Sequence, residues 1–239
     1  MRAQDSFGPD LWIFEGPLVR DMGFLFATRM VVAKLADGAL WVSSPVAVSS
    51  ETLKFIDSLG PVKYLVAATP RHVWRLASWH ELYPNAELWA ARTTPFTLKK
   101  GFLPLTGTLE DTPPRAWKDD FDQLAFRGNP LIEEVCFFHW KSRTLLVDDL
   151  IQYHPRKNGK LLRNLLLKLE GVADQYGVGL DIRLSFLHRE RARESLKKLL
   201  SWDFDKLIVA HGPCIERHAR AIAERAFGWL REGDAEPQG

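Results

Sequence analysis

The sequence predicts an α/β fold in which helices cover a β-sheet. Short apolar stretches, rich in β-branched and aromatic residues, alternate along the chain with segments of helical periodicity. No internal repeat and no linker divides the 239 residues, a length that suits one large domain. The 46% apolar and 26% charged fractions are typical of a globular protein and exclude disordered and collagen-like chains.

Nine segments are predicted as strands, because each is a short apolar stretch bounded by turn residues. Asp37-Gly38 separates two of them and is typical of a hairpin turn. Residues 139–142 form the turn of a later strand pair, which ends at Asp148-Asp149. The predicted strands are residues 11–14, 30–35, 39–42, 62–67, 86–90, 121–126, 133–138, 144–147 and 207–209.

Six segments are predicted as helices. Ser49 is a suitable N-cap for the first of them, which Gly60-Pro61 ends, and Pro84 stops the second. Residues 101–120 are predicted as a loop, because they are interrupted by Pro104, Gly107, Pro113 and Pro114. The predicted helices are residues 50–59, 73–83, 92–100, 159–169, 190–200 and 215–230.

Charge, cysteine content and hydropathy exclude several classes of protein. The net charge of +2 is too weak to indicate a nucleic-acid partner. Two cysteines exclude a disulfide scaffold and an all-cysteine zinc site. The polar N-terminus lacks the features of a secretory signal, and no apolar stretch reaches the ~18 residues that span a bilayer. We therefore expect a cytoplasmic protein whose thiols are reduced, and not an integral membrane protein. We expect its partner to be a small-molecule substrate.

Three loops at predicted strand exits carry residue types that bind metals. They are Pro70-Arg71-His72, Asp148-Asp149 and His211-Gly212. In α/β folds the loops at the carboxyl ends of strands commonly build the functional site. Two imidazoles and a carboxylate are suitable ligands for a catalytic metal ion.

These segments resemble the metallo-β-lactamase fold superfamily, and most of all its DUF4336 branch, a domain of unknown function. VVAKLADGALWVSSP resembles the opening hairpin of that family, and the segment from Val62 to Ala90 resembles its first metal loop with the following helix and strand. EVCFFHWKSRTLLVDDL resembles the later strand pair, and KLIVAHG the strand before the last metal histidine. The resemblance implies an αββα sandwich, two mixed sheets with helices outside, over residues 11–231, with flexible tails at 1–10 and 232–239.

The metal loop of the superfamily reads His-x-His-x-Asp-His, and this sequence departs from it. His72 falls on the last histidine, whereas Ala67, Thr69 and Arg71 occupy the other three positions. A further family histidine would lie near Asn129 or Pro130, and neither position holds one. The resemblance therefore implies at most one divalent metal, zinc or iron, held by His72, Asp149 and His211.

Each of these residues also has an ordinary structural interpretation. His72 is either a metal ligand or a loop residue that caps the next helix. Asp149 is either a ligand with a catalytic role or a turn residue, and Asp148 is interpreted as structural. His211 is either a ligand or a residue at the entry to the last helix.

Two further residues are assigned to the same site. Glu134 precedes an apolar stretch and is a candidate catalytic residue, either as a fourth ligand or as a partner of one. Arg71 is a candidate for binding an anionic group of the substrate. His139 and His154, in contrast, are interpreted as histidines without a functional partner, His139 being a solvated turn residue.

Residues 156–168 combine leucines with the cations Arg156, Lys157, Lys160, Arg163 and Lys168. This pattern is typical of a helix with a solvated basic face over the core, and also of a helix that binds an acidic partner or a membrane surface.

The sequence therefore predicts a metal-dependent hydrolase with a degenerate, at most mononuclear site. Two alternatives remain. Two histidines and a carboxylate are also the ligand set of non-haem iron redox enzymes. A non-catalytic binding protein on a vestigial metallo-hydrolase scaffold, with no cofactor, would account for the missing ligands.

Overall fold

Strand β9 (Glu134–His139) shows how the chain is layered, because its alternate side chains enter two different cores. Val135 and Phe137 pack between two β-sheets, whereas Cys136 and Phe138 pack beneath helices on the outer side. The structure is a computed structural model, and it describes residues 6–21, 24–94 and 103–231.

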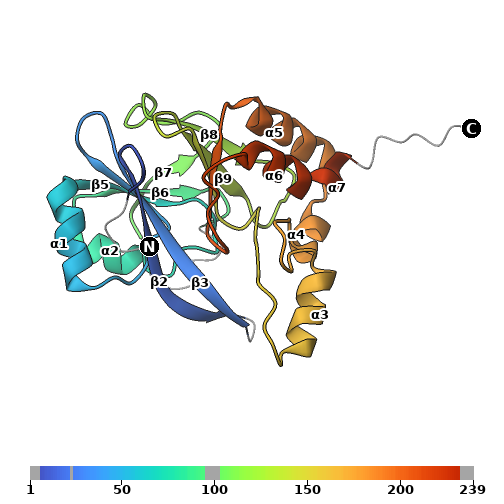
Figure 1. Ribbon diagram of the computed structural model, residues 1–239. Helices are drawn as coiled ribbons and strands as arrows, with labels where there is room; N and C mark the ends of the chain where they lie inside the picture. The colour runs from blue at the N-terminus through green and yellow to red at the C-terminus, as the bar shows by residue number, and fades with distance from the viewer. Residues whose placement is uncertain (1–5, 22–23, 95–102, 232–239) are drawn as a thin grey trace, which may run out of the picture.

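The first sheet has seven strands that lie in chain order, β1 to β7. Strands β1 to β4 pair antiparallel, and β4 to β7 pair parallel. Helices α1 and α2 cover its outer face, where Ile56, Leu76 and Trp79 are buried (Figure 1). These elements are β1 (Ser6–Gly8), β2 (Leu11–Asp21), β3 (Phe24–Lys34), β4 (Leu40–Ser43), α1 (Ser50–Leu59), β5 (Val62–Ala67), α2 (Leu76–Leu82), β6 (Glu87–Ala91) and β7 (Leu105–Leu109).

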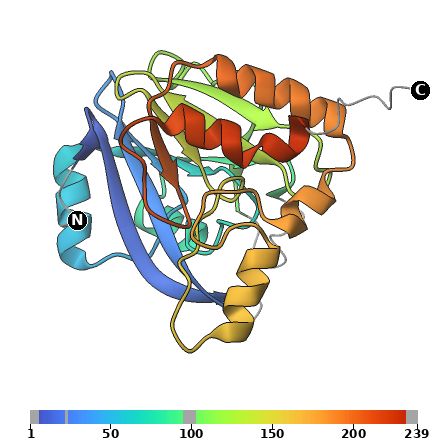
Figure 2. The ribbon, with the colours of Figure 1, turned by 45° about the vertical axis from the view of Figure 1, so that its right-hand side comes forward.

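The second sheet has four strands in the order β11-β10-β9-β8, with β10 and β11 parallel and the other pairs antiparallel. Helices α4, α5 and α6 contribute side chains to its outer core, while α3 buries none of its residues and extends from the body (Figure 2). These elements are β8 (Phe121–Phe126), β10 (Thr144–Val147), α3 (Leu161–Leu169), α4 (Leu180–Ser185), α5 (Arg189–Ser201), β11 (Lys206–Val209), α6 (Ala219–Ala226) and α7 (Gly228–Arg231).

The predicted sandwich of two mixed sheets with helices outside is confirmed. Its central core joins residues of both sheets, among them Trp41 of β4 and Phe121 of β8, whose ring centroids lie 4.6 Å apart. Among the described residues, no helix has the length and apolar content to cross a bilayer.

Three predictions about individual elements were wrong. Strand β7 lies within the predicted loop 101–120 and pairs with β6. Gly107, which indicated a loop, permits this pairing, because a Cβ there would lie 2.4 Å from the ring of Trp89. The predicted helix 215–230 is interrupted: Ile215 forms two backbone hydrogen bonds with Leu207, and His218 has a φ of 60°. Residues 6–8, predicted as part of a tail, form β1, since Phe7 is buried in the central core.

Two further predictions concern segments of which the structure describes little. In the predicted helix 92–100, residues 92–94 form a turn and the others lie outside the described residues. The predicted C-terminal tail, residues 232–239, also lies outside them.

Candidate metal site

His72 lies in the loop that follows β5, and hydrogen bonds within the loop hold it in place. Its backbone N–H donates to the carbonyl of Thr69 at 3.2 Å, and Trp74 Nε1 donates to the carbonyl of Arg71 at 2.7 Å. The imidazole itself is largely buried. The loop therefore directs one histidine from the carboxyl edge of the first sheet towards the second.

Asp149 follows β10, and the buried carboxylate of Glu134 holds its backbone. The backbone N–H groups of Asp148, Asp149 and Leu150 donate to the two Glu134 oxygens at 2.7, 2.8 and 3.0 Å. Burial, together with the charges of Asp148 and Asp149, raises the pKa of Glu134 to about 8, while the hydrogen bonds from the backbone of Asp148 and Asp149 act in the opposite direction. Glu134 thus shapes the loop that presents Asp149.

His211 follows β11, the parallel neighbour of β10, so Asp149 and His211 leave the second sheet at the same edge. Arg29 of β3 donates from Nη1 to the carbonyls of Val209 and Gly212 on either side of His211. Gly212 has a φ of 129°, and a Cβ there would lie 2.7 Å from the Cβ of Tyr153. Only glycine fits this turn without moving its neighbour.

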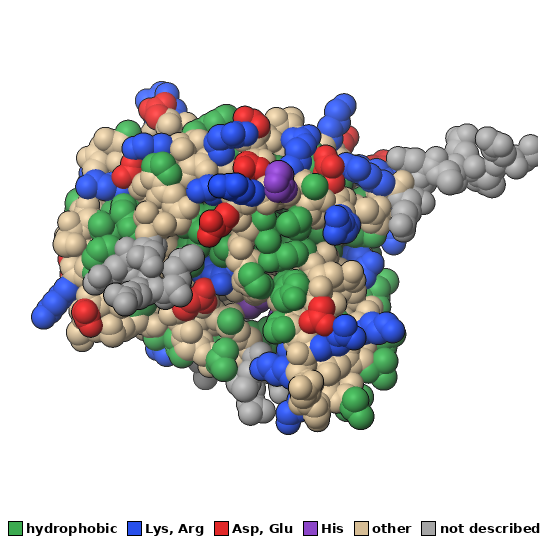
Figure 3. All heavy atoms as spheres, viewed as in Figure 1, with side chains coloured by type: hydrophobic (Ala, Val, Ile, Leu, Met, Phe, Trp, Pro, Cys, Tyr) green, Lys and Arg blue, Asp and Glu red, His purple; other side chains and the backbone are tan. Residues whose placement is uncertain are grey.

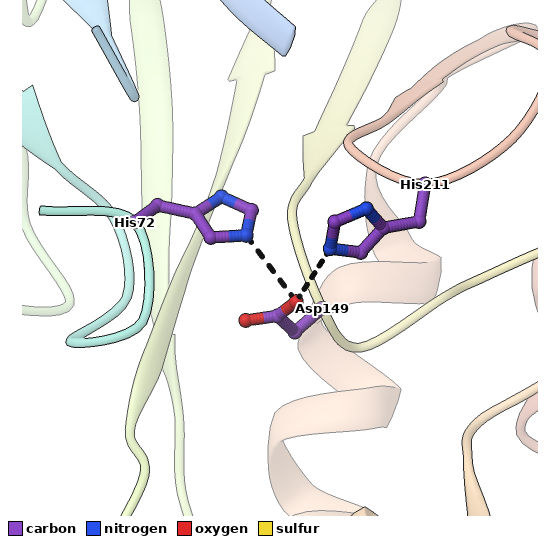
Figure 4. A group of neighbouring side chains, drawn as sticks. All are labelled: His72, Asp149 and His211. Atoms are coloured by element: carbon purple, nitrogen blue, oxygen red, sulfur yellow. Dashed lines mark ion pairs between the residues drawn. The ribbon is translucent and has the colours of Figure 1, made fainter. Parts of the chain in front are cut away.

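The three side chains converge, as the sequence predicts. One ligand atom from each lies within 4.8 Å of the others. His72 Nε2 and His211 Nε2 each lie 3.3 Å from the same atom, Asp149 Oδ1, and Figure 4 shows the two imidazoles approaching that carboxylate from opposite sides. Three elements that are far apart in the sequence therefore present their ligand atoms to one point.

The Nδ1 atoms of both histidines have hydrogen-bond partners of their own. His72 Nδ1 lies 3.1 Å from Asp148 Oδ2, to which Ser44 Oγ also donates at 2.6 Å. His211 Nδ1 donates to the carbonyl of Ala27 at 2.9 Å. Each ring is thus held at Nδ1, and its Nε2 atom faces Asp149. This is the arrangement by which proteins orient metal-binding histidines.

The charges of the site residues shift one another's pKa values. Burial opposes protonation of His72, but the carboxylates of Asp149 and Asp148 outweigh it and raise the pKa of His72 well above its usual value. Burial likewise opposes ionisation of Asp149, and His72 and His211 together hold the pKa of that carboxyl well below its usual value. The carboxylate is therefore ionised, as a metal ligand must be.

A cavity of about 560 Å³ adjoins the three residues, which belong to its wall. Phe26, Trp74 and Leu167 give it an apolar lining. Arg71 lies on the wall as well, and its guanidinium pairs with Asp181 at 3.5 Å. The cavity has the size of a small-molecule site.

Glu134 and Arg71 are outside the group of ligand atoms. Glu134 reaches the site only through the backbone of residues 148–150, and Arg71 only through the cavity wall. Thr69, at one of the positions of missing family ligands, donates to Asp149 Oδ2 at 3.5 Å and is fully buried. A hydroxyl that contacts Asp149 thus stands where the family pattern has a histidine.

Two neighbours of the candidate ligands were not predicted from the sequence. Asp148, interpreted as structural, orients His72. His154, interpreted as a histidine without a partner, lines the cavity with its ring stacked 6.0 Å from that of His211, and its Nε2 lies 3.0 Å from Gln152 Oε1. Burial lowers the pKa of His154 to about 4, so it is neutral at pH 7. The only feature of the sequence that indicated the contact between His154 and His211 is the position of His154, five residues after Asp149.

Comparison with known proteins agrees with the fold. A family model described as a domain of unknown function, DUF4336, matches residues 10–176. This range includes His72 and Asp149 and ends before His211. No curated protein matches the chain.

Solved structures match over nearly the whole chain at low identity. A metal-soaked Flv1 flavodiiron core from Synechocystis sp. PCC6803 is 12% identical with a TM-score of 0.63, and the match covers 97% of this chain and 61% of that one. A putative diflavin flavoprotein fragment from Nostoc sp. PCC 7120 is also 12% identical with a TM-score of 0.63, covering 95% and 94%. A metallo-β-lactamase from Pontibacter korlensis is 11% identical with a TM-score of 0.61, covering 93% and 95%.

Proposed function

Because the chain belongs to the DUF4336 family and has the metallo-β-lactamase fold, we propose that it binds one divalent metal ion and acts as a metal-dependent hydrolase on a small molecule. One observation carries the proposal. Both histidines have Nδ1 occupied by an acceptor and Nε2 directed at the same carboxylate oxygen. Both Nε2 atoms and this oxygen thus lie close enough together to bind one cation.

His72 Nε2, His211 Nε2 and Asp149 Oδ1 would hold the metal. Three protein ligands leave a position for water, which is typical of catalytic zinc sites. The metal would lower the pKa of a bound water towards ~7 and polarise the bond to be cleaved.

The surrounding residues have defined roles in this proposal. Asp148 orients His72, and Glu134 holds the loop of Asp149, so both are positioning residues. Asp149 would hold the metal through Oδ1, while Oδ2 accepts from Thr69 Oγ1 at 3.5 Å and thereby keeps the carboxylate in position. Arg71 binds an anionic group of the substrate in the cavity.

Metal analysis of the purified protein tests this function. We expect about one equivalent of metal or less per chain, because Thr69 and Arg71 occupy positions where a second metal would need ligands, and a guanidinium cannot act as one. The variants His72→Ala and His211→Ala should lose the metal, and His188→Ala, which changes an exposed histidine outside the site, should retain it. Two equivalents would contradict the proposal. So would a metal content near zero after reconstitution, which would favour the non-catalytic binding protein.

An iron-dependent redox enzyme is the second candidate. The two-histidine, one-carboxylate ligand set favours it, since non-haem iron sites use the same set. Metal competition distinguishes the two candidates: preferential retention of iron with no hydrolytic activity in the zinc form would favour the redox enzyme.

A further inference from the structure

Helix α3 has an exposed apolar surface that the proposed function does not use. Leu161, Leu162, Leu165, Leu166 and Leu169, here called the leucine face, are between 39% and 84% exposed. At 100° per residue they occupy one side of the helix. Exposed leucines that are scattered singly are ordinary, but five on one helical face indicate an interaction surface.

Cations surround this face, and of these Arg156 pairs with Asp174. Residues 156–169 contain five Lys and Arg and no Asp or Glu. The structure gives Lys157, Lys160 and Lys168 no ion pair with any residue that it describes, and all three are exposed. In Figure 3, hydrophobic and Lys or Arg side chains lie together on the protruding lower right part of the molecule, where Figure 1 places α3.

The basic turn before α3 is fixed against the helix. Asn164 accepts from the backbone N–H of Lys157 at 3.0 Å and donates to its carbonyl at 2.8 Å. Arg163 donates to the carbonyl of Pro155 at 3.0 Å. The cations at 157 and 160 are therefore held beside the leucine face.

We propose that the leucine face of α3 docks onto an anionic lipid membrane, with Lys157, Lys160 and Lys168 at the headgroups. An amphipathic helix with a basic polar part lies in the plane of a bilayer and binds more tightly when the lipids are anionic. Charge complementarity favours this occupant over a second copy of the chain, because two such faces in contact would bring lysines of like charge together. The docking does not depend on the metal site.

The arrangement of α3 also brings the membrane close to the cavity. Arg163, Leu166, Leu167 and Glu170 line the cavity wall, and Leu166 belongs to the leucine face as well. A membrane seated on this face would therefore lie beside the cavity.

Vesicle co-sedimentation of the full chain tests the proposal. Binding to vesicles of equimolar phosphatidylcholine and phosphatidylglycerol should be at least about tenfold tighter than to phosphatidylcholine alone. It should weaken at ~1 M salt, where charges more than ~3 Å apart are screened.

Two pairs of substitutions identify the surface. Leu161→Ser with Leu165→Ser, and Lys160→Glu with Lys168→Glu, should each reduce binding by about tenfold or more. All four side chains are exposed, so the variants should fold, which circular dichroism verifies. The matched controls Leu82→Ser and Lys54→Glu change exposed residues on α2 and α1 and should leave binding unchanged.

Several results would overturn the proposal. They are equal binding to both kinds of vesicle, binding that the α3 variants leave unchanged, and a dimer that forms without lipid and dissociates in Leu161→Ser, measured by analytical ultracentrifugation. Binding of an acidic protein through α3, with no binding to vesicles, would also contradict it.

Discussion

His72 and His211 are oriented by different acceptors, a carboxylate and a backbone carbonyl. Asp148 Oδ2 faces His72 Nδ1 at 3.1 Å, while the carbonyl of Ala27 accepts from His211 Nδ1. Only the first of these partners can be changed by mutation of a side chain. The contribution of ligand orientation can thus be measured at His72.

Asp148→Asn should weaken metal affinity by about 10- to 100-fold, because the substitution removes the charged acceptor that orients His72 while leaving the ligands in place. Competition with a chromophoric chelator measures the change. Asp203→Asn, which alters an exposed partner of Arg143, is the matched control and should bind like the wild type. Equal affinities for Asp148→Asn and the wild type would show that Asp148 does not orient the ligand.

His139 is a buried histidine outside the candidate site, and the prediction that it is a solvated turn residue was wrong. Its ring packs 4.9 Å from that of Phe121, and Nδ1 lies 2.7 Å from Ser142 Oγ. Burial lowers the pKa of His139 to about 4. Between that value and the ordinary pKa of 6.5, the unfolded chain binds a proton that the folded protein does not, so stability falls as the pH falls.

Lowering the pH from about 7 to about 5 should therefore cost about 1–2 kcal/mol of unfolding free energy through His139, at ~1.4 kcal/mol per pH unit. In His139→Gln, whose side chain does not titrate, the difference between the two pH values should be smaller by that amount. Urea denaturation at both pH values measures it. An unchanged difference would mean that His139 keeps an ordinary pKa.

The candidate site was predictable from the sequence only in its ligands. His72, Asp149 and His211 each follow an apolar strand, and this local pattern can be recognised in the amino-acid sequence. The contacts of His154 with His211 and of Thr69 with Asp149 join segments whose proximity depends on how the two sheets pack. No local pattern carries that information.

At the scale of single elements, α1 begins where the sequence predicts. Ser49 Oγ accepts from the backbone N–H of Thr52 at 3.1 Å and thereby satisfies one free donor of the first turn.

Ser49→Ala should lower the free energy of unfolding by about 1 kcal/mol, since the N–H of Thr52 loses its acceptor. Chemical denaturation measures the loss. Ser58→Ala removes an exposed hydroxyl from the same helix, away from its N-terminus, and should change stability by less than about 0.5 kcal/mol. Comparable losses in both variants would argue against a capping role.

Elements with strong local signals were predicted and those set by tertiary contacts were not. The turn Asp37-Gly38 and the buried strand β5 carry their own pattern. Strand β7 depends on the approach of Trp89 to Gly107, and the start of α6 depends on the bridge between Ile215 and Leu207. Gly107 led to the prediction of a loop, and helical periodicity led to the prediction of a helix that begins at Ile215. Both predictions failed because pairing with distant strands determines the backbone conformation in these two segments.

At the scale of the whole molecule, the site connects the two sheets. His72 comes from the end of β5 in the first sheet, whereas Asp149 and His211 come from β10 and β11 in the second. A metal ion bound by all three would therefore cross-link the halves of the sandwich.

Zinc at about 100 times its dissociation constant should stabilise the fold by ~2.7 kcal/mol, because the unfolded chain cannot bring the three ligands together. For a chain of this size this corresponds to a rise in Tm of roughly 5–10 °C. Differential scanning calorimetry with zinc, and again after addition of a chelator, measures it. A Tm that zinc leaves unchanged in the wild type, or raises equally in His211→Ala, would contradict binding at this site.

The separation of the ligands along the chain sets a condition on biosynthesis. The ribosome makes His72 first and His211 last, 139 positions later (72 to 211). His211 follows β11, the last strand of the second sheet to be synthesised. A nascent chain released before β11 would contain two of the three ligands and lack the strand that supports the third. Metal capture would thus distinguish chains translated past His211 from chains terminated before it, since only the former can close the site.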